Sequence, residues 1–146
     1  MTLTDTTARS QTESISFEFD LHHLPEKVWQ ALTDPALLGE WLLPVTDLEL
    51  DPGTPFTFKA QPQPGWDGIV HCRFLEIEAQ RKLSYTWVVG DIDTVVTFTL
   101  TPTPLGTRLV LVQAGFGRDQ KKNFGGARYG WNLMGGKLVD LLARIP

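Results

Sequence analysis

The longest helical pattern in the chain lies near its C-terminal end, from Phe124 to Ile145. Apolar residues recur there every three or four positions and so share one face of a helix, while Lys137, Asp140 and Arg144 fall on other faces. The apolar stripe consists of Ala127, Trp131, Met134, Leu138, Leu141, Leu142 and Ile145. Because almost all of the preceding chain has the pattern of strands, this amphipathic helix is the expected cover for the apolar face of a sheet.

Two adjacent glycines, Gly135 and Gly136, lie in the middle of this helix. Each costs about 1 kcal/mol relative to alanine in a helix interior. Their missing side chains either let the helix approach the sheet closely or bend, or leave room for a ligand between helix and sheet. We favour the packing interpretation.

The chain before the helix alternates apolar and polar residues, which is typical of half-buried strands. The alternation is cleanest where Val96, Phe98 and Leu100 are interleaved with threonines. The pattern predicts strands at residues 14–21, 45–50, 55–60, 66–78, 83–89, 94–101 and 107–114, with a bulge at Asp67-Gly68.

Two short helices are expected after the first strand, at residues 26–32 and 35–42. Asp34 is a good N-cap for the second helix, and Pro35 suits its first position. The later strands are linked by short turns and should pair antiparallel. The sequence therefore predicts an α+β fold, in which a curved antiparallel sheet of about six to seven strands wraps around the long C-terminal helix.

The length of 146 residues fits one domain, which we expect over residues 14–146. Residues 1–13 are rich in threonine and serine and are expected to form a disordered tail. Cys72 is the only cysteine, which excludes an intrachain disulfide and fits a reducing compartment. With no secretory signal and no run of roughly 18 apolar residues, the expected location is the cytoplasm and no membrane partner is expected.

The charge distribution argues against a nucleic-acid partner. The net charge is −4, and the basic residues are scattered rather than gathered in a stripe. No ligand spacing typical of a metal site and no cofactor-binding motif is present.

Few residues are suited to acid–base or nucleophilic catalysis. His22 and His23 are adjacent at a strand end and are expected at the surface, and His71 shares its strand phase with Arg73, which favours the outer face or rim of the sheet. Cys72 has no activating neighbour and is expected to be a small buried residue. The sequence therefore favours a protein that is not an enzyme.

Aromatic residues on inward phases suggest a pocket instead. Gln113 continues the phase of Leu109 and Leu111, so it is expected as a polar group in an apolar wall, where a ligand could supply a hydrogen-bond partner. The alternative is that the same residues make a filled core, which we favour for any one of them taken alone. The candidate ligand-binding residues are Trp41, Tyr85, Trp87, Phe98, Gln113 and Trp131.

Several stretches from Ser14 onward match a known family in order and spacing. They are Pro25 to Pro35, Leu38 to Trp41, Phe74 to Ile77, Leu83 to Trp87, Thr97 to Pro102, Gly106 to Leu109, and Gly130-Trp131 with the leucines that follow. With these residues the chain resembles the START-related helix-grip superfamily, which includes the birch pollen allergen and aromatic polyketide cyclases. Within it, the chain is similar to the branch named after the activator of the heat-shock-protein-90 ATPase.

The resemblance implies a cavity between the curved sheet and the C-terminal helix, used across the superfamily for lipids, sterols, polyketides and other apolar molecules. It also implies that the short helix carrying Trp41 closes one end of that cavity. Gln113 departs from the pattern, since many relatives have a histidine before the Gly-Phe pair, here Gly115-Phe116. An activity that depends on that histidine is therefore not carried over by the resemblance.

Three functions remain open from the sequence. The leading hypothesis is the binding of a small hydrophobic or aromatic molecule. The second is a cyclase or hydrolase acting on a polyketide-like substrate, for which Gln113, Tyr85 and His71 are the residues to test. The third is a co-chaperone or other interaction protein, suggested only by the name of the branch. The sequence also leaves open a homodimer formed through an exposed strand edge.

Overall fold

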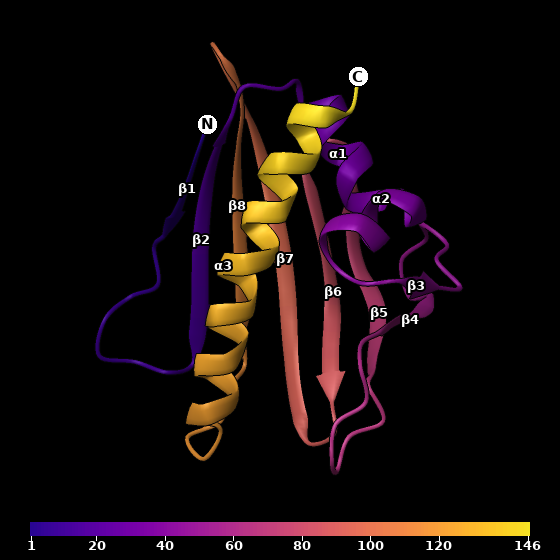
Figure 1. Cartoon of the computed structure of the whole chain (residues 1–146), viewed down its shortest axis with the longest axis vertical. Helices are drawn as coiled ribbons and strands as arrows, with labels where there is room; N and C mark the ends of the chain where they lie inside the picture. The colour runs from indigo at the N-terminus through magenta and orange to yellow at the C-terminus, as the bar shows by residue number, and fades with distance from the viewer.

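The computed structural model describes residues 1–146 and consists of one eight-stranded sheet and three helices (Figure 1). The elements are β1 (Thr2–Asp5), β2 (Ser14–Leu21), α1 (Pro25–Thr33), α2 (Pro35–Trp41), β3 (Val45–Thr46), β4 (Pro55–Lys59), β5 (Ile69–Glu78), β6 (Lys82–Val89), β7 (Ile92–Thr103), β8 (Gly106–Ala114) and α3 (Lys121–Arg144). None of the helices is both long and apolar enough to span a membrane.

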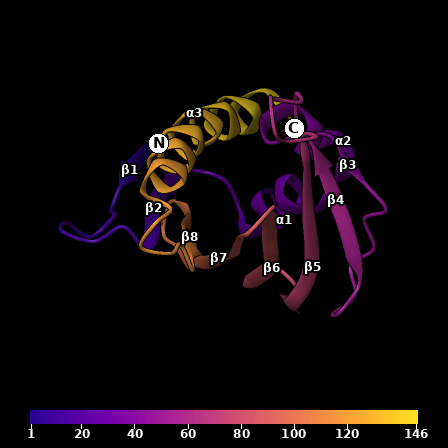
Figure 2. The same ribbon diagram turned by 90° about the horizontal axis from the view of Figure 1, so that it is seen from below.

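The sheet is antiparallel throughout, with the strand order β1-β2-β8-β7-β6-β5-β4-β3. The α1–α2 pair separates β2 from the meander that follows, so β2 pairs with β8 at the far end of that meander. The sheet curls around α3, which lies against its concave side (Figure 2). The predicted α+β fold with a long C-terminal helix is confirmed.

Strand β1 lies in the segment for which the sequence predicted a disordered tail, so that prediction is wrong for residues 2–5. The strand pairs with β2 along Thr2–Asp5, and its end is tied to α3 by an ion pair in which Arg128 Nε donates to Asp5 Oδ2 at 2.6 Å. Burial raises the pKa of Asp5, but hydrogen bonds from Arg128 and Thr7 outweigh it and hold that pKa below its usual value. The pairing with β2 and the ion pair with Arg128 both involve residues distant in the sequence, so the local pattern of residues 2–5 does not reveal them.

The predicted strand bounds needed three further corrections. Only Val45–Thr46 is a strand within residues 45–50, and β5 begins at Ile69 rather than at residue 66. The chain turns at residues 63–66, where two backbone hydrogen bonds join Gln63 and Trp66. The irregularity in β5 lies between Phe74 and Glu76 rather than at Asp67-Gly68.

The core fills the concave side of the sheet. Inward residues of β2, β7 and β8 meet the apolar stripe of α3, whose Trp131, Leu138 and Leu141 are almost fully buried. At the other end of the sheet, aromatic rings of β4, β5 and β6 form a cluster whose centroids lie 4.5–6.1 Å apart, made of Phe56, Phe58, Phe74 and Tyr85. The alternation seen in the sequence therefore sorts the two faces of the sheet correctly.

At Gly135, α3 packs closely against the first two strands. A Cβ atom built on Gly135 would lie 2.9 Å from Cδ2 of Leu3 and 3.1 Å from the Phe19 ring, whereas one on Gly136 would meet no atom within 4 Å. The packing interpretation of the glycine pair thus holds for Gly135, and neither glycine lines the cavity described below.

The two glycines are expected to respond in opposite directions to leucine. Gly135→Leu should lower the free energy of unfolding by about 1–3 kcal/mol, because the added side chain overpacks against Leu3 and Phe19. Gly136→Leu should raise it by about 0.5–1 kcal/mol through helix propensity alone. Urea unfolding of both variants measures the difference, and an equal gain in both would contradict close packing at Gly135.

Candidate functional site

An apolar cavity of about 540 Å³ lies between α3 and the sheet. Its walls come from the ends of β6, β7 and β8, the loop before α3, the first half of α3, and single residues of two earlier loops. Nine of its 14 lining residues are hydrophobic. The hydrophobic lining residues are Leu43, Trp66, Trp87, Val89, Ile92, Phe116, Ala127, Trp131 and Met134. The other five are Gln113, Lys122, Asn123, Gly126 and Gly130.

Small residues of α3 keep this space open. Gly126, Ala127 and Gly130 line the cavity along the helix. A Cβ atom on Gly126 would meet no atom within 4 Å, and one on Gly130 would meet only Met134 Cε, at 3.7 Å. The sequence left open room for a ligand at Gly135-Gly136, but in the structure the space lies one to three turns earlier in the same helix.

Three of the six candidate ligand-binding residues line the cavity, namely Trp87, Gln113 and Trp131. The two indole rings are neighbours, with centroids 5.6 Å apart, so together they form one aromatic wall. Phe98 lies behind that wall, edge-to-face with Trp131 at 6.2 Å.

The other three candidates, Trp41, Tyr85 and Phe98, are buried in the core and do not line the cavity. Trp41 on α2 packs edge-to-face on Phe98 at 6.4 Å, and its Nε1 donates to the Ala31 carbonyl at 2.8 Å. In the structure these three side chains contact the core rather than the cavity.

A buried chain of hydrogen bonds links the helix to the sheet behind the aromatic wall. Trp131 Nε1 donates to Gln113 Oε1 at 2.7 Å, and Gln113 Nε2 donates to Thr94 Oγ1 at 2.9 Å. Thr94 Oγ1 in turn donates to the Trp87 carbonyl at 2.8 Å. Because an indole nitrogen can only donate, it fixes the orientation of the amide and hence the direction of the whole chain.

These hydrogen bonds change the role expected for Gln113. The side chain is 2% exposed, and both ends of its amide have partners within the protein. Its oxygen and nitrogen are bonded to Trp131 and Thr94, so neither needs a ligand as a hydrogen-bond partner. Sequence reasoning missed Thr94, although the register that pairs it with Trp87 across β6 and β7 could have found it.

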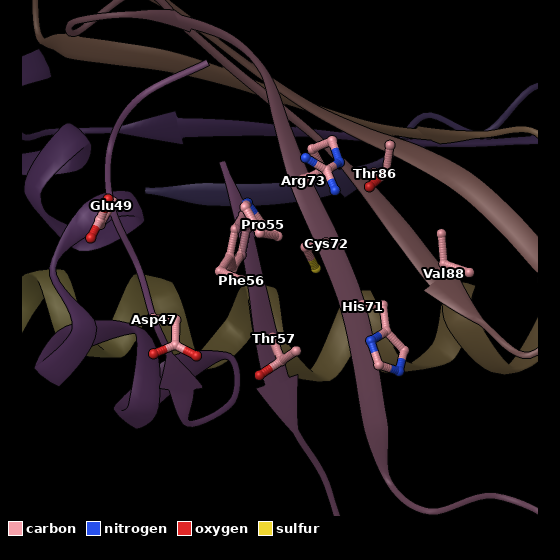
Figure 3. Close-up of a pocket in the computed structure, with 10 residues that line it drawn as sticks. All are labelled: Asp47, Glu49, Pro55, Phe56, Thr57, His71, Cys72, Arg73, Thr86 and Val88. Atoms are coloured by element: carbon pink, nitrogen blue, oxygen red, sulfur yellow. The ribbon is translucent and has the colours of Figure 1, made fainter. Parts of the chain in front are cut away.

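A second hollow, of about 650 Å³, lies on the outer face of the sheet over β4, β5 and β6 (Figure 3). The exposed side chains of His71 and Arg73 belong to it, which confirms the outer position expected for His71. Only three of its ten lining residues are hydrophobic. The lining residues are Asp47, Glu49, Pro55, Phe56, Thr57, His71, Cys72, Arg73, Thr86 and Val88.

The titratable groups of the core are held in their neutral forms. Burial raises the pKa of the Cys72 thiol to about 12, so the thiol is protonated at neutral pH and is not a nucleophile. Burial, together with Cys72, raises the pKa of Tyr85 well above its usual value. No group of three or more histidine, cysteine, aspartate and glutamate side chains is placed to hold a metal ion.

The two adjacent histidines lie outside the cavity. His22 is exposed, as predicted. His23 is half-buried, with Nδ1 3.2 Å from Lys27 Nζ and Nε2 buried without a partner. Burial first, and then the charges of Lys27 and His22, lower its pKa, so His23 is neutral at pH 7.

The chain matches the family model described as "Activator of Hsp90 ATPase homolog 1-like protein" over residues 22–143. The chain belongs to this family. The resemblance found in the sequence is thereby confirmed, and the helix-grip fold agrees with it. No curated protein matches the chain.

Solved structures of similar fold come from several sources. Protein MLL2253 from Mesorhizobium loti is 41% identical, with a TM-score of 0.84 over 91% of this chain and 98% of its own. Protein CV1439 from Chromobacterium violaceum is 26% identical, with a TM-score of 0.74 over 91% and 99%. DynU16, from the dynemicin biosynthetic locus, shares the fold at 19% identity and a TM-score of 0.77, over 90% of this chain and 48% of DynU16.

Proposed function

We propose that the protein binds a small hydrophobic or aromatic molecule in the cavity between α3 and the sheet. The observation that carries the proposal is the cavity itself, whose volume of about 540 Å³ lies within the range of ligand sites. Its walls are mostly apolar and include three tryptophans, Trp66, Trp87 and Trp131. Aromatic walls of this kind suit an apolar or planar ligand.

The wall is preorganised, which supports the proposal. The hydrogen-bond chain through Gln113 and Thr94 fixes the Trp131 ring and the backbone at Trp87. A ligand would therefore pay little to order these groups when it binds. DynU16, which shares this fold, comes from a biosynthetic locus, and this fits a small molecule as occupant.

Native mass spectrometry of gently purified protein tests the proposal directly. We expect a copurified small molecule, or saturable binding when aromatic compounds are added. A thermal-shift titration should then show stabilisation that grows with ligand concentration, reaching about 2.7 kcal/mol at a hundredfold excess over Kd. An apo mass with no shift from any apolar compound would overturn the proposal.

We do not propose an enzymatic function. Of the three residues named for it, only Gln113 borders the cavity, and an amide neither gives nor takes a proton near neutral pH. His71 lies on the opposite face of the sheet, and Tyr85 is buried among aromatic rings.

A further inference from the structure

The two exposed polar side chains of the cavity are neighbours in the sequence. Lys122 is the only charged residue among its 14 lining residues, and no aspartate or glutamate lines it. Lys122 and Asn123 lie in the first turn of α3 and are exposed. They form part of the solvent-facing edge of the cavity, which we call its mouth. The cavity thus has a mostly apolar lining and a single positive charge, at its exposed edge.

Lys122 has no anionic partner within the protein. The four ion pairs of the structure involve other residues. The first turn of α3 contains no acidic residue, and Gln120, which precedes it, does not cap the helix. Its side chain instead accepts from Gly117 N and donates to the Asp91 carbonyl.

Other charged residues lie near the mouth in the sequence, but none of them lines the cavity. The segment that leads into the helix, residues 118–122, contains Arg118 and Lys121 besides Lys122, against a single carboxylate at Asp119. Asp91 and Asp93, on the neighbouring hairpin, do not line the cavity. The positive end of the α3 dipole adds to the potential of Lys122.

The buried end of the cavity, at Gln113 and Trp131, offers a ligand no polar group that is free to bind it. Gln113 is the only polar side chain there, and its amide already bonds Trp131 and Thr94. Burying an unpaired polar group against the tryptophan wall would cost free energy. A ligand's charged group should therefore stay at the mouth, where water and Lys122 are within reach.

We infer that the ligand is an anionic amphiphile, with an aromatic or apolar body against Trp87 and Trp131 and a carboxylate, sulfonate or similar anion beside Lys122. The inference rests on the proposed function, since it assigns a chemical class and an orientation to the occupant of the same cavity. Lys122 then selects among apolar molecules by charge rather than by shape.

Two dyes with nearly the same ring system test this inference. Anilinonaphthalene sulfonate carries the anion, and N-phenylnaphthylamine is its neutral counterpart; both become fluorescent in apolar sites. We expect the wild-type protein to bind both, the sulfonate more tightly, with the preference shrinking as salt is added.

Matched lysine variants locate the effect. Lys122→Met should weaken the sulfonate relative to the neutral dye about three- to fivefold, the size of an exposed ion pair. Methionine keeps the helix propensity of lysine, so folding should not be affected. Lys121→Met removes the same charge next to the cavity but not from its lining, and should change neither affinity by more than about twofold.

The outcomes separate the two proposals. Tight binding of the neutral dye with no preference for the sulfonate would overturn the anionic class and leave the cavity as a binding site. An equal effect of the Lys121 and Lys122 variants would also overturn it, because a general field would then explain the preference. Failure of the wild-type protein to bind either dye would overturn the proposed function as well.

Discussion

Replacing Gln113 with leucine is expected to lower the free energy of unfolding by about 2–3 kcal/mol, although leucine fills a similar volume. The change leaves the Trp131 indole N–H without an acceptor and removes a donor from Thr94, and both groups are about 1% exposed. A buried donor without a partner costs its full desolvation. Urea unfolding at neutral pH measures the loss.

A double-mutant cycle with Trp131→Phe assigns this loss to the hydrogen bond. Trp131→Phe alone leaves Gln113 Oε1 without its donor, whereas the double variant has no stranded polar group at this contact. The loss of unfolding free energy in the double variant should therefore be smaller than the sum of the two single losses, by at least about 1 kcal/mol. Strict additivity would mean that the two side chains do not depend on each other.

Histidine at position 113 provides a conservative control. A neutral imidazole has one acceptor and one donor, so it is able to replace the amide between Trp131 and Thr94. Gln113→His should therefore lose less stability than Gln113→Leu at neutral pH. In acid the histidine variant should lose more stability than it does at neutral pH, because protonation of the imidazole removes its acceptor. A leucine variant as stable as the wild type would contradict the structural role of the chain.

The sequence predicted those parts of the fold that depend on local periodicity. Residues 94–101 alternate strictly and the α3 stripe repeats every three to four positions, so each segment reveals its buried face without its neighbours. Strand β1 could not be found in this way. Its four residues, Thr-Leu-Thr-Asp, are ordered by pairing with β2 and by the contact of Asp5 with Arg128, more than 100 residues away.

The site was predicted less completely, for a physical reason. Inward phase places Trp41, Phe98 and Trp131 alike on the concave side of the sheet, but it does not say whether the space in front of each is filled. That depends on how far α3 lies from each strand, which is decided by the packing of side chains along the whole helix. Gly126 and Gly130 are the only sequence sign of it, and glycines in a helix have several explanations.

Gly130→Phe is expected to lower the affinity of the cavity for a neutral aromatic dye at least about tenfold without destabilising the fold. Gly130 lines the cavity, and only Met134 Cε would lie within 4 Å of an added Cβ. The phenylalanine should therefore occupy the ligand's space rather than displace the core. Exchanging glycine for phenylalanine in a helix should itself raise stability by about 0.5 kcal/mol.

Gly125→Phe is the matched control, since Gly125 is exposed on the same helix and does not line the cavity. Side chains in a helix point back toward its N-terminus, so the ring at position 130 should lie over Gly126, which has no side chain to oppose it. The ring at position 125 has no such path into the cavity.

Titration of N-phenylnaphthylamine into both variants, with unfolding curves to show that each is folded, should therefore separate them. If the Gly130 variant bound the dye as tightly as the Gly125 variant, the dye would bind outside this cavity, and the outer hollow near His71 would be the next surface to test.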